Sequence, residues 1–160
     1  MPTATFRRAE KKDVPLILDF IRRLAAYEHM EHDVTATPVL LEEWLFEKKT
    51  AEVLFAVDEN GREVGFALYF HNFSTFLGKA GIYLEDLFVL PEERGLGYGK
   101  GLIAALARTA LDRGCGRLEW SCLDWNTPSI EFYKSLGARV MDEWSVYRLT
   151  VPEMEKLAGK

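Results

Sequence analysis

A glycine-rich turn is the stretch of this sequence best suited by composition to bind a ligand. Residues Arg94 to Gly101 read RGLGYGKG and lie between a predicted strand and a predicted long helix. Glycines in such a turn let backbone N–H groups approach an anion closely, and the helix dipole adds attraction. A phosphate or pyrophosphate is the ligand that this turn favours. The alternative is a tight turn that uses several glycines for conformational reasons alone.

Two familiar phosphate-binding motifs fit this turn poorly. A Walker A loop requires Ser or Thr after Gly-Lys, but Gly101 follows Lys100. The dinucleotide pattern GxGxxG requires a third small residue, and Lys100 or Leu102 occupies that place in either register.

Two adjacent carboxylates interrupt an apolar predicted strand, and a third lies near a predicted helix end. Glu85 and Asp86 lie between Leu84 and Leu87, while Glu28 follows the first predicted helix. Adjacent strand residues point to opposite faces, so at most one of the pair faces a given cleft. An unpaired buried carboxylate is costly, which favours a functional role for one of them. For Glu28 the alternative is a solvated side chain.

The first half of the chain alternates strand and helix signals. Apolar alternation predicts a strand over residues 3–8, and Asp13 is expected to cap a helix that ends near Tyr27. Thr37-Pro38 opens a second helix. Strands are predicted over residues 53–57 and 64–70, and Asn60-Gly61 between them predicts a type I′ hairpin turn.

The second half predicts crossover connections and a single mixed α/β domain over residues 1–160. Its expected elements are strands over 81–89 and 118–123, helices over 97–113 and 128–136, and closing strands over 139–142 and 146–151.

Composition excludes several classes of protein. The chain has 160 residues, 48% of them apolar, and a net charge of -5, which disfavours a nucleic-acid partner. No apolar run approaches the roughly 20 residues of a membrane span, and the N-terminus lacks a signal peptide's apolar region. Cys115 and Cys122 suggest reduced cysteines in a cytoplasmic protein, and a nucleophilic role for either is disfavoured. The histidines show no zinc-type spacing with them, so no metal is expected.

Several local strings resemble the GNAT acetyltransferase superfamily, and within it the spermidine/spermine (diamine) acetyltransferases. Arg94-x-x-Gly97-x-Gly99 after the strand LEDLFV matches the superfamily's acetyl-CoA-binding motif. The strings AYEHME at residues 26–31, GFALY at 65–69, YLEDLFV at 83–89 and WNTPSIEFYK at 125–134 indicate the subfamily. The resemblance runs from about Phe6 to Leu149. It implies an α/β fold with a mixed, mostly antiparallel central sheet flanked by helices, and a homodimer.

The resemblance also implies roles for individual residues. Tyr133 and Glu85 would be catalytic. Tyr27, Glu28, Glu85 and, from a looser match, Glu143 would bind the amine. The residues expected to bind acetyl-CoA are Leu87, Phe88, Val89, Arg94, Gly95, Leu96, Gly97, Tyr98, Gly99, Lys100, Asn126, Pro128 and Ser129. Without the family match, Tyr133 beside Phe132 would be assigned to the core.

The chemistry expected from these residues is direct acetyl transfer to a primary amine in a ternary complex. An alkyl ammonium has a pKa near 10.4, so about one molecule in 2,500 is the free base at pH 7. Glu85 would act through a water relay, and Tyr133 would protonate or hydrogen-bond the leaving thiolate. The expected substrate is a small polycation or a lysine-like amine, and the sequence does not separate the two. The alternatives are an enzyme of this fold that acetylates a protein, or a non-catalytic acyl-CoA sensor.

Overall fold

Four antiparallel strands and one parallel strand form the sheet that organises the first part of the chain. The computed structural model describes residues 4–160, and its contacts group them into a unit that ends at Ser121 and a unit spanning Cys122–Lys160. The sheet order is β1-β2-β3-β4-β5, and only the β4–β5 pair is parallel. This confirms the predicted mixed α/β fold. The strands are β1 Thr5–Arg8, β2 Glu52–Val57, β3 Glu63–Ser74, β4 Lys79–Val89 and β5 Leu118–Trp120. Thr3, where the first predicted strand begins, lies outside the described residues.

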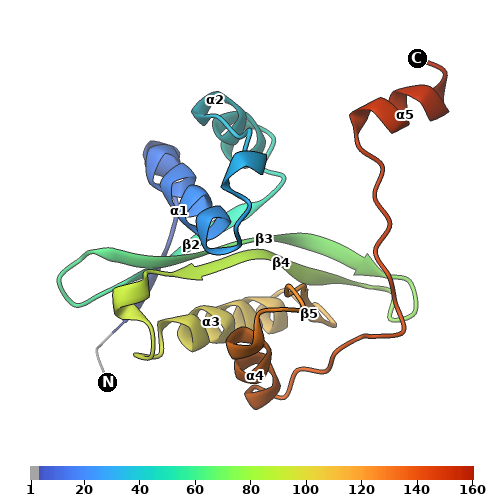
Figure 1. Cartoon of the computed structure of the whole chain (residues 1–160). Coiled ribbons are helices and arrows are strands. Elements are labelled where there is room, and N and C mark those ends of the chain that lie inside the picture. The colour runs from blue at the N-terminus through green and yellow to red at the C-terminus, as the bar shows by residue number, and fades with distance from the viewer. Residues whose placement is uncertain (1–3) are drawn as a thin grey trace. The chain divides into compact units, whose positions relative to one another are not determined.

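Helices cover both faces of this sheet (Figure 1). Helix α1 (Val14–Tyr27) and the short α2 (Pro38–Leu41) lie on one face, and α3 (Tyr98–Asp112) lies on the other. A π-helical turn over Glu42–Glu47 continues α2, and three 3₁₀ turns span Lys11–Asp13, Glu31–Asp33 and Pro91–Glu93. Thr37 opens α2 as predicted, because its hydroxyl oxygen accepts the N–H of Leu40 at 3.2 Å.

Aromatic residues form the core beneath α1. Phe55, Phe66 and Phe88 are in register on β2, β3 and β4, and Phe20 of α1 packs on all three. Its ring lies 5.2 Å from that of Phe66 and nearly parallel to it. Burying large rings stabilises the fold in proportion to the apolar area removed from water, so this cluster fixes α1 on the sheet.

On the opposite face, a glycine allows α3 to approach β1 closely. A Cβ at Gly101 would lie 2.6 Å from Cζ of Phe6, which is closer than two carbon atoms can pack. The last glycine of the predicted phosphate-binding turn is therefore required for helix packing.

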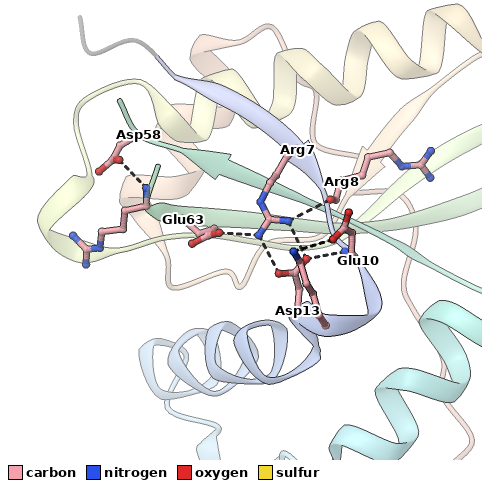
Figure 2. Close-up of polar contacts among 8 residues, drawn as sticks. Arg7, Arg8, Glu10, Asp13, Asp58 and Glu63 are labelled. Atoms are coloured by element: carbon pink, nitrogen blue, oxygen red, sulfur yellow. Dashed lines mark hydrogen bonds and ion pairs between the residues drawn. The ribbon is translucent and has the colours of Figure 1, made fainter. Parts of the chain in front are cut away.

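The predicted cap of α1 is an ion-pair centre. Asp13 precedes the helix as expected, but its side chain makes no cap hydrogen bond to the helix. Its carboxylate instead accepts two hydrogen bonds from Arg7 of β1, at 2.9 and 3.0 Å, and one from the N–H of Glu10 (Figure 2). The hydrogen bonds from Arg7 hold the pKa of Asp13 below its ordinary value. Arg7 also donates to Glu63 of β3 at 2.7 Å. The network ties the start of α1 to two strands.

The β2–β3 turn differs from the predicted type I′ hairpin. Among the described residues, only His29 and Lys49 have positive φ apart from glycines, so Asn60 lacks the left-handed conformation that type I′ requires. The Asp58 carboxylate accepts the N–H groups of Asn60 and Arg62 at 2.9 and 3.0 Å. This side-chain bonding stabilises a longer turn in which only Gly61, at φ 81°, is left-handed.

The second unit contains α4 (Thr127–Ser135) and α5 (Val151–Ala158). The predicted strands over 139–142 and 146–151 are wrong, because residues 138–150 form neither strand nor helix and α5 begins at Val151. A strand persists only where a partner takes its backbone hydrogen bonds, and no such pairing is made by this segment. Throughout residues 4–160, every helix is too short or too polar to cross a membrane.

Candidate active site

A β-bulge places the paired carboxylates at an irregular point of the sheet. Asp86 pairs with Leu68 of β3 and Leu84 pairs with Tyr69, which leaves Glu85 as the extra residue of β4. Bulges bend a strand and redirect its side chains. Asp86 lies two residues from Phe88 and therefore shares its face, the one that packs on α1. Glu85 is exposed, whereas Asp86 is partly buried.

Asp86 has the most strongly shifted carboxyl in this region. Burial, with smaller contributions from the negative charges of Glu85 and Glu28, raises the pKa of Asp86 to about 7. Burial also raises the pKa of Glu28, at the end of α1. Glu28 and Glu85, both predicted to bind the amine, thus raise the pKa of the same side chain, Asp86, which was not among the predicted site residues. The signal that could have found it was the alternation with Phe88, which assigns Asp86 to the α1 face.

The edge of β4 opens beyond this bulge. Strand β5 pairs with β4 only from Ile82 to Leu84, so Leu87, Phe88 and Val89 lie past the end of that pairing. Backbone groups on such an edge can pair with an extended ligand in the manner of an added strand. The predicted strand over 118–123 ends early, at Trp120, and this shortening creates the opening.

The glycine turn continues from this edge into α3. Gly95 and Gly97 have φ of 79° and 93°, conformations that residues with a Cβ adopt at a cost. Gly97 caps α3, and the first bond of the helix runs from the N–H of Gly101 to the carbonyl of Gly97 at 2.9 Å. The N–H groups of residues 97–100 therefore precede the first intrahelical bond. Tyr98 is buried, and Leu96 and Lys100 are exposed. This arrangement suits an anion such as a pyrophosphate.

Arg94 and Tyr27, predicted for two different ligands, are in contact. The Arg94 guanidinium lies 4.8 Å from the centre of the Tyr27 ring and 5.3 Å from that of Phe88. Its Nε donates to the Val89 carbonyl at 3.0 Å. Arg23 and Pro91 help to line the cleft beside them, whose volume is about 370 Å³.

The remaining predicted residues belong to the second unit. Asn126 is buried and its side-chain oxygen accepts the N–H of Ser129 at 3.4 Å, so it caps α4. Pro128 lies in the first turn of that helix, and Tyr133 follows on it with its ring 5.5 Å from that of Phe132. Glu143 is exposed in the irregular segment after α4. Within the part of the chain that the structure describes, no three metal-ligating side chains are grouped as a metal site requires.

The fold is that of an acyltransferase: it has a mixed sheet with a bulged fourth strand, and a glycine turn at the start of α3. The sequence matches the acetyltransferase (GNAT) family over residues 17–138, and the chain belongs to this family. The predicted resemblance is thereby confirmed, and the protein is an N-acetyltransferase.

Known relatives act on amines. A thialysine N-epsilon-acetyltransferase of Sus scrofa is 38% identical over 171 aligned positions that span 100% of both chains. The spermidine/spermine N(1)-acetyltransferase-like protein 1 of Homo sapiens is 33% identical, over 95% of this chain but 23% of that protein. An integron cassette protein from the mobile metagenome of V. cholerae has a solved structure with a TM-score of 0.80 and 31% identity, covering 98% of each chain. Acetylation of an amine is the activity for which the Sus scrofa protein is named.

Proposed function

We propose that the protein transfers the acetyl group of acetyl-CoA to a primary amine of a small polycationic or lysine-like molecule, by direct attack in a ternary complex. The observation that carries this proposal is that the bulge places Asp86 on the face of β4 that packs against α1, where the charges of Glu28 and Glu85 act on it and its pKa is raised to about 7. A partly buried carboxyl with two further carboxylates whose charges act on it suits a cation with more than one charge. The relatives named for thialysine and for spermidine/spermine support the same class of substrate.

Asp86 is a better base toward the ammonium than a carboxylate of ordinary pKa. A carboxylate of ordinary pKa is a weak base toward an ammonium of pKa near 10.4, and raising the base's pKa to about 7 narrows that gap by about three units. In this mechanism Asp86 accepts the ammonium proton, directly or through a water held by the exposed Glu85. The neutral nitrogen then adds to the acetyl carbon and the bond from that carbon to sulfur breaks. The nitrogen loses its second proton to solvent as the amide forms, which balances the proton that Tyr133 gives to the sulfur and later regains.

The donor side of the reaction uses backbone groups. The N–H groups of residues 97–100 would bind the pyrophosphate, and the open edge of β4 at Leu87 to Val89 would bind the pantetheine arm. A strand N–H near Phe88 or Val89 would stabilise the negative oxygen that develops on the acetyl carbon. Tyr133 would give its proton to the sulfur that leaves. Homodimer formation and a cytoplasmic location belong to the same proposal.

Thiol release from acetyl-CoA tests this function in one experiment. We expect spermidine, thialysine and ornithine to release thiol faster than butylamine at equal concentration, by 10- to 100-fold in kcat/KM. Mass spectrometry should find one added acetyl group on the amine. Activity only with peptides would favour a protein acetyltransferase, and acetyl-CoA binding without turnover on any amine or peptide would favour a sensor.

A further inference from the structure

Arg94 is the first residue of the glycine motif that is expected to bind acetyl-CoA, yet its side chain contacts Tyr27, which is expected to bind the amine. Its guanidinium stacks over Tyr27, at the end of α1, and over Phe88, on the open edge of β4. The hydrogen bond from Nε to the Val89 carbonyl, at 3.0 Å, restrains the guanidinium beside the two rings. One side chain thus contacts the element predicted to receive the amine and the element predicted to receive the acetyl donor.

We infer that Arg94 is a positioning residue that couples the two substrate sites, so that acetyl-CoA bound at the glycine turn orders the amine site and a bound amine strengthens acetyl-CoA binding. This inference rests on the proposed function. It differs from the cofactor-binding role that the resemblance implies, because the guanidinium contacts the rings of Tyr27 and Phe88.

The backbone around Arg94 makes such coupling physically reasonable. Arg94 is extended, at φ -75° and ψ 156°, and lies between the 3₁₀ turn Pro91–Glu93 and the left-handed Gly95. A pyrophosphate that binds the N–H groups after Gly95 restrains the turn and, with it, the start of the Arg94 side chain. A restrained guanidinium in turn holds the Tyr27 ring through cation–π contact. By linkage, an amine that binds better to the held Tyr27 must raise the affinity for the donor by the same factor.

Only arginine can make this set of contacts. Its planar guanidinium stacks on two rings while Nε–H donates in the plane, whereas a lysine ammonium is a single point charge without a flat face. Arg23 lines the same cleft but is paired with Asp19 at 2.9 Å. It therefore provides a matched control of the same residue type in the same cleft.

The experiment measures the affinity for CoA, the unreactive product, by calorimetry with and without saturating spermidine or thialysine. In the wild-type protein we expect the amine to strengthen CoA binding about fivefold or more. Arg94→Met should reduce this ratio to about one and raise the amine KM about tenfold, the ratio being taken against the CoA affinity of the variant itself in the absence of amine. Arg94→Lys should not restore the ratio, and Arg23→Met should leave it unchanged.

A double-mutant cycle with Tyr27 separates coupling from simple loss of contacts. Tyr27→Ala by itself should remove the strengthening of CoA binding by the amine. Adding Arg94→Met to Tyr27→Ala should change CoA binding little further, because both substitutions remove the same contact.

Arg94 is exposed, so its variants are expected to fold, and melting curves check this. Equal loss of CoA affinity with and without amine, an unchanged amine KM, or additive effects of Arg94→Met and Tyr27→Ala would overturn the inference. If the wild-type protein acetylates no amine, the proposed function fails and the inference falls with it; if it is active but the ratio survives Arg94→Met, only the inference fails.

Discussion

Two adjacent carboxylates on β4 have different environments, and the bulge explains why. Glu85 is the extra residue of the bulge and is exposed, whereas Asp86 faces α1 and its pKa rises to about 7. In the sequence both are carboxylates in the middle of the same predicted strand, and only the family resemblance favours Glu85. What the sequence could not supply was the register shift, since a bulge depends on how β3 and β4 pair.

Asp86→Asn should lower kcat and raise the melting temperature. Loss of a general base costs about 10²- to 10⁴-fold in kcat, and the wild-type kcat/KM should fall as pH drops through about 7, where Asp86 becomes protonated.

The sign of the stability effect follows from the raised pKa of Asp86. Above pH 7 the folded protein carries an unfavourable charge that Asn lacks, so the variant should melt at a higher temperature than wild type. This advantage should shrink as pH falls from 7 to 4, because the folded wild type then holds a proton that the unfolded chain has lost. Below pH 4 both forms are neutral and the melting temperatures should agree. Melting curves across this range, together with steady-state rates, test both halves, and a variant that is no more stable at pH 8 would contradict the raised pKa.

Glu28→Gln should remove the preference for substrates with two or more amino groups. One charge-assisted hydrogen bond to the second ammonium contributes about 1–3 kcal/mol, which corresponds to a 10- to 100-fold preference over a monoamine. The rate with butylamine should stay near wild type, because burial and not the charge of Glu28 is the main cause of the raised pKa of Asp86. The affinity for acetyl-CoA should also stay near wild type, because Gln keeps the size of the side chain. Equal loss on mono- and diamines would show that Glu28 acts on the reaction and not on the second charge.

At the scale of elements, local sequence signals predicted most of the helices and strands. They failed where a segment needs a partner strand in order to form a strand. Helices α1, α3 and α4 have apolar spacing and start signals in their local sequence, and each lies within a few residues of its prediction. The predicted strand over 146–151 is wrong, because no strand pairs with that segment. The helix that begins at Val151 had its own signals, Thr150 before Pro152 and Glu153, with a left-handed Gly159 at its end.

The glycines of the turn before α3 have separable purposes, and two variants should distinguish them. Gly97→Val forces a β-branched residue into a left-handed cap and should weaken acetyl-CoA binding about tenfold or more, because the N–H groups that follow lose their arrangement. Gly101→Val places carbon against the Phe6 ring and should cost about 1–3 kcal/mol of stability through overpacking. The affinity of folded Gly101→Val for acetyl-CoA should remain within about twofold of wild type, as measured by calorimetry at low temperature. Comparable loss of affinity in both would assign Gly101 to the ligand site as well.

At the scale of the whole molecule, the predicted chemistry draws on both units. The carboxylates, the open edge of β4 and the glycine turn all belong to the unit that ends at Ser121, whereas Tyr133, Asn126 and Ser129 belong to the unit from Cys122 onward. The sequence predicted these residues through resemblance, because contacts between distant parts of a chain leave no local signal. A variant in the second unit therefore tests whether that unit contributes to the reaction.

Tyr133→Phe provides that test. The change keeps the ring, which packs beside Phe132, and removes only the hydroxyl. If the hydroxyl protonates the leaving thiolate, kcat should fall about 10²- to 10⁴-fold while acetyl-CoA affinity and melting temperature change little. The deficit should shrink with an acyl donor whose thiol is more acidic, since a better leaving group has less need of a proton. That dependence on the leaving group distinguishes an acid in the reaction from a tyrosine that only packs, for which the loss would be the same with every donor. A variant with wild-type turnover would restrict Tyr133 to the packing of α4 and leave the chemistry to the carboxylates of the first unit.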